Sequence, residues 1–216
     1  MAYLMRMITP PRWIQEQHEI TCLEDINAES LSDLSAEENA ISTWYVGDKS
    51  ENEIRHAVLA LTSGFRSLDE IKVVYLDVNI IRQAGLSVAE TTGITKIEEY
   101  ANLHRDIDQL NAGKLIQLAN IILEQVWNNQ TQTFCAEDIA LWMLQIINDG
   151  KLDFNSLDKN FRKGFASRVK KMINKKKIVL QNLNPSLRQE IERQWEQNKK
   201  RTNCQYENQC PKYGCV

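Results

Sequence analysis

The sequence predicts an α+β protein with a small, partly parallel sheet in its N-terminal part and a helical C-terminal half. Before residue 85, two short apolar runs flank a segment patterned as a helix, and beyond it apolar residues recur mainly at helical spacing. Of the 216 residues, 43% are hydrophobic and 25% are charged, which is ordinary for a folded protein. We therefore divide the chain into an α/β portion at 1–85, a helical portion at 86–200 and a cysteine-containing tail at 201–216.

A strand, a helix and a second strand are predicted in the N-terminal portion. The runs 41–46 and 72–78 are rich in β-branched and aromatic residues, which favour strands. Between them, Ser50 and Glu53 have the spacing of a capping box at the start of a helix. Two parallel strands joined by a crossover helix form a βαβ unit, so we expect these strands to be parallel. The run 3–8 is a candidate third strand.

Helices are predicted for most of the chain after residue 85. The first begins at a capping box formed by Thr95 and Glu98. The helix at 136–148 is apolar almost all round, so it is expected at the centre of the helical portion. The predicted segments are a helix at 95–113, a helix at 114–127, a polar loop at 128–133 and a helix at 136–148.

A basic helix is predicted to begin near Asn155 or Ser156. Its apolar stripe includes Phe161 and Phe165, which we expect to pack against the helices at 114–127 and 136–148. Gly164 lies in the middle of this helix, where it is unfavourable relative to alanine by roughly 1 kcal/mol, so we interpret it as a close helix contact. A short strand at 178–180 and a polar helix at 185–200 are predicted to follow.

The charges of the chain are strongly separated. Residues 159–188 contain ten Lys or Arg residues and no Asp or Glu, although the net charge of the whole chain is only -3. The remaining 186 residues therefore have a net charge of -13, and eight acidic residues lie between residues 15 and 39. Such a separation predicts a surface that meets anions. The anion can be nucleic acid, an acidic partner protein or the acidic N-terminal segment of the chain itself.

The candidate binding residues are the lysines of the basic helix and of the turn that follows it. A line of cations is sufficient for binding to phosphates without sequence preference. The alternatives are docking to an acidic protein and a merely solvated helix face. A helix-turn-helix is disfavoured, because the loop at 128–135 is longer than the tight turn of that motif. The candidate residues are Lys159, Lys163, Lys170, Lys171, Lys175, Lys176 and Lys177.

Two carboxylates offer an alternative, enzymatic interpretation. Asp48 and Asp77 lie at or just past the carboxyl ends of the two predicted strands, and parallel strands place these ends at the edge where α/β sheets bind ligands. A pair of carboxylates there can bind Mg²⁺ together with a substrate phosphate. An Asp after a strand is, however, more often turn chemistry that satisfies backbone donors, and we favour this interpretation.

The remaining motifs exclude more than they indicate. No glycine-rich phosphate loop, Gly-x-Ser-x-Gly string or His-Glu-x-x-His helix is present, so we expect no cofactor and no catalytic residues. Cys204, Cys210 and Cys215 lack the close pair and the His of a zinc site; a metal site, a disulfide and an unremarkable terminus remain as alternatives. No apolar run reaches the roughly 18 residues of a membrane span, which predicts a cytoplasmic protein.

These observations favour a non-catalytic accessory or adaptor protein that uses its basic helix to bind nucleic acid or an acidic protein within a complex. One alternative is an enzyme that acts on a phosphate-containing substrate at Asp48 and Asp77. Another is an immunity or inhibitor protein that uses its acidic N-terminal region. In its general character, the sequence resembles small bacterial proteins encoded in multi-gene defence or conflict systems. The binding role is favoured if the acidic segment 24–38 does not cover Lys159, Lys163 and Lys170.

Overall fold

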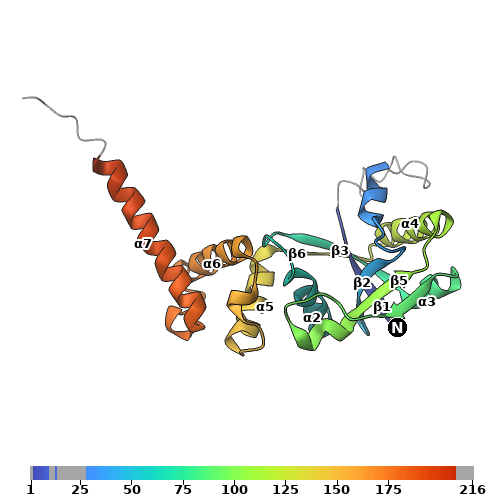
Figure 1. Ribbon diagram of the computed structural model, residues 1–216, viewed down its shortest axis with the longest axis horizontal. Helices are drawn as coiled ribbons and strands as arrows, with labels where there is room; N and C mark the ends of the chain where they lie inside the picture. Colours follow the sequence, from blue (N-terminus) through green and yellow to red (C-terminus); the bar gives the residue numbers. More distant parts are fainter. Residues whose placement is uncertain (1, 10–12, 14–27, 208–216) are drawn as a thin grey trace, which may run out of the picture.

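Figure 1 shows a computed structural model of the protein, which describes residues 2–9, 13 and 28–207. A six-stranded sheet has helices on both faces, and the C-terminal helices extend from one end of it. The order of the strands is β4-β5-β2-β1-β3-β6, and every neighbouring pair is antiparallel. The strands are β1 (Tyr3–Ile8), β2 (Ile41–Val46), β3 (Ile71–Asp77), β4 (Ser87–Glu90), β5 (His104–Asp108) and β6 (Thr131–Phe134).

The α+β class is confirmed, but the partly parallel sheet is wrong. Strands β2 and β3 run in the same direction and are joined through helix α2 (Glu51–Thr62). Strand β1 lies between them and pairs with both, so that Tyr3 is opposite Val46 on one side and Asp77 on the other. The crossover connection therefore exists without a parallel ladder. Local patterns indicate which segments are strands, whereas a distant segment decides which strands become neighbours.

Part of the predicted helical portion is instead strand. The segment predicted as a helix at 95–113 contains the 3₁₀-helix η3 (Glu98–Leu103) and then strand β5. In β5, Ile107 is fully buried while its neighbours are partly exposed. Pairing with β2 therefore buries this apolar residue, as a helix would also have done. The predicted loop at 128–133 contains the start of β6, which pairs with β3. The sheet thus continues past residue 85.

The two faces of the sheet bury separate apolar clusters. On one face, Trp44 and Val46 pack with helix α2 and with the C-terminal helices. On the other face, Leu4 and Ile107 pack with helix α4 and the short elements around it. The elements of this second face are η2 (Ala28–Leu34), α3 (Val78–Gln83) and α4 (Ala112–Trp127). Alternating strand residues serve the two faces, as the period of a strand requires.

Helices α5 (Ala136–Asn148), α6 (Lys159–Asn174) and α7 (Pro185–Glu207) form the C-terminal extension. Helix α5 packs on α2, α6 packs on α5, and α7 packs on α6 and on η4 (Phe154–Ser156). Figure 1 shows α7 running away from the sheet at the end of the molecule. The predicted strand at 178–180 is instead a turn leading into the 3₁₀-helix η5 (Leu180–Asn182).

Helix α6 differs from its predicted form in three respects. Its N-cap is Asp158, whose carboxylate accepts hydrogen bonds from the backbone amides of Asn160 and Phe161. Phe161 is buried with α5 but not with α4, because the apolar residues of α4 belong to the other face of the sheet. Gly164 is exposed, and a methyl group added there would meet no atom within 4 Å, so it is not a close helix contact.

Candidate functional site

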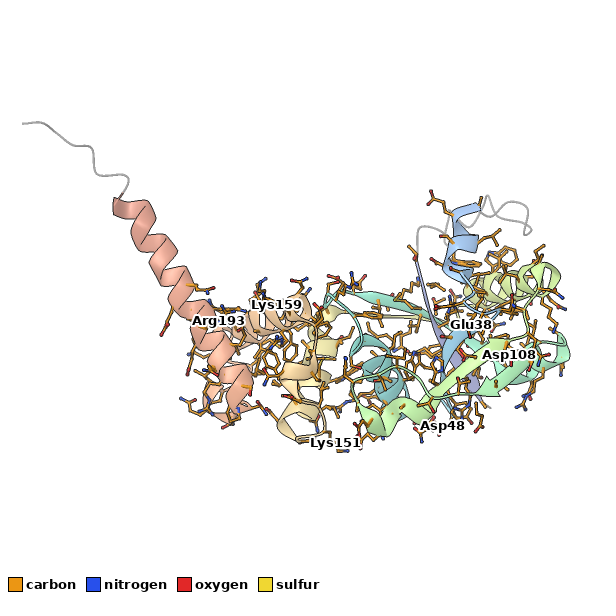
Figure 2. The ribbon with its side chains drawn as sticks, viewed as in Figure 1. Glu38, Asp48, Asp108, Lys151, Lys159 and Arg193 are labelled. Atoms are coloured by element: carbon orange, nitrogen blue, oxygen red, sulfur yellow. The ribbon has the colours of Figure 1, made fainter. Side chains whose placement is uncertain are left out.

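The basic surface lies at the end of the molecule formed by α6 and α7. Figure 2 shows Lys159 and Arg193 at this end, while Glu38 and Asp108 lie at the other end with the sheet. The apolar stripe of α6 includes Phe161, Phe165 and Val169, each fully buried. Because that stripe faces the core, the lysines on the remaining face of the helix point toward solvent. The basic helix α6 thus lies away from Glu38 of the acidic N-terminal segment.

The seven candidate lysines do not share one environment. Lys175 and Lys177 contact Glu137 of α5, with Nζ–O distances of 4.0 and 2.6 Å. The ammonium of Lys177 lowers the pKa of Glu137, and the carboxylate raises the pKa of Lys177 in return. Lys170 is half-buried, with its Nζ 5.7 Å from the ring centroid of Trp195. The three therefore have partners within the protein.

The other four lysines are exposed and unpaired within the described part of the chain. They are Lys159, Lys163, Lys171 and Lys176. Lys163 lies one turn after Lys159 on α6, and Lys171 is rotated by about 80° from Lys163 on the same solvent-facing side, all within about 18 Å of the helix length. These side chains form the part of the basic surface that is available to an anion.

A groove between α6 and α7 extends this surface. It has a volume of about 440 Å³ and is lined by Lys163, Ser167, Arg193, Gln194 and Gln197. None of these lining residues is acidic, so the groove offers cations, a hydroxyl and two amides. The sequence prediction missed Arg193, because it lies beyond the run of basic residues and among the glutamates of α7.

A neighbouring groove has a different electrostatic character. Its volume is about 470 Å³, and its lining includes Glu190, Glu192 and Glu196 together with Arg162. Arg193 borders both grooves, and its guanidinium donates from Nε and Nη2 to the carboxylate of Glu190 at 2.9 and 2.7 Å. This ion pair raises the pKa of Arg193 and lowers that of Glu190. Adjacent flanks of α7 therefore favour ligands of opposite charge.

The acidic N-terminal segment does not cover α6 where it is described. Element η2, which carries Glu29 and Asp33, packs against α4 on the opposite face of the sheet. The Asp33 carboxylate accepts hydrogen bonds from the Thr9 backbone amide and from Nε1 of Trp13. Residues 24–27 of the predicted acidic segment lie outside the described residues. From residue 28 onward, the segment is held by its own half of the molecule.

Asp48 and Asp77 are engaged in turn chemistry. The Asp48 carboxylate accepts a hydrogen bond from the Ser50 amide at 2.8 Å, which lowers the pKa of Asp48. Asp77 caps helix α3 by accepting from the Asn79 amide at 2.7 Å. Because β1 lies between β2 and β3, the two residues lie at or just past the ends of strands about 10 Å apart. Among the described residues, no group of three or more His, Cys, Asp or Glu is placed to hold a metal ion.

Lys49 occupies the space beside Asp77 at this edge of the sheet. Its Nζ lies 3.7 Å from the ring centroid of Tyr3 and 4.7 Å from that of Tyr75, and donates to Oε1 of Gln130 at 2.7 Å. Burial lowers the pKa of Lys49, and the negative charge of Asp77 partly offsets this effect. An internal cation thus provides charge compensation where the enzymatic hypothesis places a metal ion.

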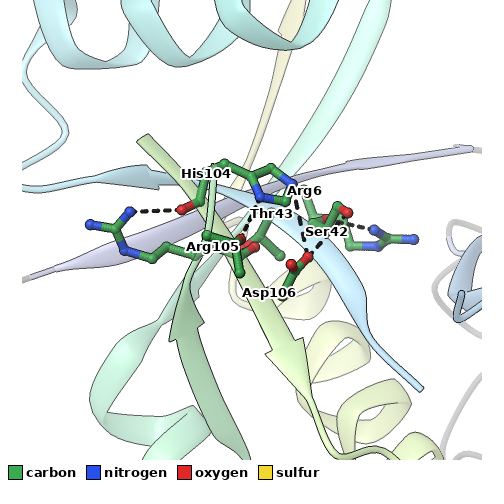
Figure 3. Close-up of polar contacts among 7 residues, drawn as sticks. Arg6, Ser42, Thr43, His104, Arg105 and Asp106 are labelled. Carbon is green, nitrogen blue, oxygen red and sulfur yellow. Dashed lines mark hydrogen bonds and ion pairs between the residues drawn. The ribbon is translucent and has the colours of Figure 1, made fainter. Parts of the chain in front are cut away.

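A polar network around His104 was not predicted from the sequence. His104 is the first residue of strand β5. Its Nδ1 is 2.7 Å from the Thr91 hydroxyl, and its Nε2 is 3.8 Å from Oδ1 of Asp106 (Figure 3). The ring packs edge-on against Trp44, and burial lowers its pKa. These contacts fix the loop that follows β4 onto the sheet.

No protein-family model, curated protein or solved structure matches this chain. Within the part of the chain that the structure describes, no helix is both long and apolar enough to cross a membrane. The predictions for Cys210 and Cys215 lie outside the described residues, as does the side chain of Cys204.

Proposed function

We propose that the protein is a non-catalytic accessory or adaptor protein that binds nucleic acid through α6 and its groove with α7. The observation that supports this proposal is the row of exposed, unpaired lysines at 159, 163 and 171 beside a groove with no acidic lining residue. Phosphate oxygens accept hydrogen bonds from ammonium, guanidinium, hydroxyl and amide donors, and this surface supplies all four. A cytoplasmic location, membership of a complex and a role in bacterial defence belong to the same proposal.

An acidic protein surface is a second candidate ligand. Glu137 shows how a carboxylate is accommodated here, since it lies between Lys175 and Lys177 with Nζ–O distances of 4.0 and 2.6 Å. A partner that presents a row of carboxylates would use the same lysines. Nucleic acid is favoured because amide and hydroxyl donors in a groove add contacts to phosphate and bases, whereas exposed ion pairs alone stabilise a protein complex only weakly.

Charge reversal of the free lysines is the direct test of nucleic-acid binding. We expect the triple variant Lys159→Glu, Lys163→Glu and Lys171→Glu to lose at least about tenfold in affinity for a mixed-sequence oligonucleotide, measured by fluorescence anisotropy. For the unaltered protein, log affinity should fall against log salt with a slope of about -3, or roughly -0.9 per contacted phosphate on a duplex. In the triple variant the slope should be much shallower, with only cations such as Arg193 left to contribute.

The control changes two lysines outside the C-terminal helices. The double variant Lys96→Glu and Lys114→Glu alters charge outside the C-terminal helices, so its affinity should stay within about twofold of the unaltered protein. Equal loss in both variants would mean that only the net charge matters. Absence of binding to any oligonucleotide at about 50 mM salt would reject the nucleic-acid proposal and leave the acidic-protein candidate.

Removal of the internal partner of Lys175 and Lys177 should increase affinity. In Glu137→Gln, the two ammonium groups lose their carboxylate and become available to phosphates. We expect a steeper salt dependence, by about -0.9 for each additional phosphate contacted, and tighter binding below about 100 mM salt. An unchanged slope, measured by the same anisotropy titration, would show that these two lysines lie outside the interface.

A further inference from the structure

We infer that the groove between α6 and α7 binds an unpaired nucleic-acid strand, with a phosphate at Lys163 and Arg193 and a base at the amides of Gln194 and Gln197. This inference rests on the proposed function and specifies its ligand. It depends on the concave shape and the chemical composition of the groove. A convex row of lysines alone would not distinguish a single strand from a duplex.

The size of the groove suits one nucleotide at a time. Its volume of about 440 Å³ falls within the range of sites for small molecules. In a duplex, the bases are stacked inside a stiff cylinder and only their edges are accessible. In a single strand, a base can leave the stack and enter a protein groove together with its own phosphate. Proteins that bind single strands commonly combine a basic groove with positions for individual bases.

The cationic side of the groove is already oriented for a phosphate. Glu190 holds the guanidinium of Arg193 through Nε and Nη2, which leaves the Nη1 donors for a ligand. Lys163 faces the same groove from α6, and its ammonium has no ion-pair partner in the described part of the chain. Ser167, one turn further along α6, adds an exposed hydroxyl. A phosphate between the helices can therefore receive donors from both sides.

The amide side of the groove suits the edge of a base. The amide nitrogen of Gln194 donates to the Lys163 carbonyl at 3.4 Å and to Glu190 at 3.0 Å, so its amide plane is held in place. Its Oε1 remains as an acceptor, and Gln197 is exposed with both donor and acceptor available. Amide side chains present the paired donor and acceptor that base edges require.

Two neighbouring features direct the strand along α6. Gly164 is exposed with no atom near its missing side chain, which permits close approach of a backbone at that point. Lys170 follows Ser167 by three residues and is held over Trp195, which fixes a further cation along the same path. On the adjacent flank of α7, Glu192 and Glu196 repel phosphates. The favourable path is therefore the groove and the face of α6 beside it.

The test compares a 12-nucleotide oligothymidine with a 12-base-pair duplex at the same salt concentration, by fluorescence anisotropy. We expect the single strand to bind at least about tenfold more tightly. Ser167→Trp fills the groove from an exposed position, so it should weaken binding of the single strand about tenfold and binding of the duplex less than threefold. Gln197→Leu removes one amide without changing charge, and about a fivefold loss confined to the single strand is expected.

Gln189→Trp is the control, because it fills the neighbouring acidic groove. It should change neither affinity by more than about twofold. Equal affinity for single strand and duplex, or equal losses for both ligands in Ser167→Trp and Gln197→Leu, would overturn the inference and leave the proposed function standing. Absence of binding to both ligands would overturn the proposed function itself. Circular dichroism of each variant establishes that α6 and α7 are folded in these comparisons.

Discussion

Replacing Phe165 by alanine is expected to lower the free energy of unfolding by about 3–5 kcal/mol. The side chain is fully buried, with its ring centroid 6.4 Å from that of Phe161 and 6.2 Å from that of Phe154. Truncation removes these ring contacts and leaves a cavity between α6 and its neighbours. Because domains are stable by only about 5–15 kcal/mol, such a loss is large. Urea denaturation followed by circular dichroism measures it.

Ser167→Ala is the matched control for this prediction. Ser167 lies two residues away on the same helix but is exposed, so its substitution should change stability by less than about 0.5 kcal/mol. A loss below about 1 kcal/mol in Phe165→Ala would be incompatible with the packing of α6 described above. Phe165→Ala should also weaken nucleic-acid binding, because the buried apolar stripe of α6 positions the lysines of this helix and one wall of the groove.

The local elements could largely be predicted from the sequence. Strands β1 and β2 have the predicted bounds 3–8 and 41–46, and helix α5 has the predicted bounds 136–148. In each case, a single strong pattern is present: short runs of mainly apolar, β-branched or aromatic residues in the strands, and apolar residues on most sides of the helix. The run of lysines is equally visible, because charge is a property of each residue and needs no knowledge of the fold.

The arrangement of these elements could not be predicted in the same way. Strand β5 was predicted as helix, since Tyr100, Leu103 and Ile107 fit helical spacing and only pairing with β2 makes the strand favourable. The insertion of β1 between β2 and β3 joins segments that are more than 30 residues apart, and it separates Asp48 from Asp77. The ladder partners of a strand are long-range properties, which local patterns do not encode.

The groove was missed for the same reason. Lys163 and Arg193 are separated by 30 residues, and Arg193 lies in a segment whose glutamates conceal it in any count of charge. Only the packing of α7 on α6 brings the two cations to one groove and directs the glutamates of α7 to the next. A helical projection of 185–197 places Arg193 between Glu196 and Glu190, so it does not separate a basic flank from an acidic one.

Replacing Gly93 by alanine is expected to lower the free energy of unfolding by about 2–3 kcal/mol. A Cβ atom at this position would lie 2.7 Å from both Cβ of His104 and Cη2 of Trp44, closer than packed carbon atoms approach one another. Both contacts are with side chains that are themselves buried, so neither neighbour can move aside freely. The displaced loop would also weaken the contact between the Thr91 hydroxyl and Nδ1 of His104.

The control for this last prediction is Gly164→Ala, which should have the opposite sign. That methyl group meets no atom within 4 Å, and alanine in the interior of a helix is favoured over glycine by about 1 kcal/mol. Thermal and urea unfolding of the two variants under the same conditions measure both effects. If Gly93→Ala were as stable as the unaltered protein, the loop after β4 could not lie against Trp44 and His104. The contacts of His104 with Thr91 and Trp44 would then need a different arrangement.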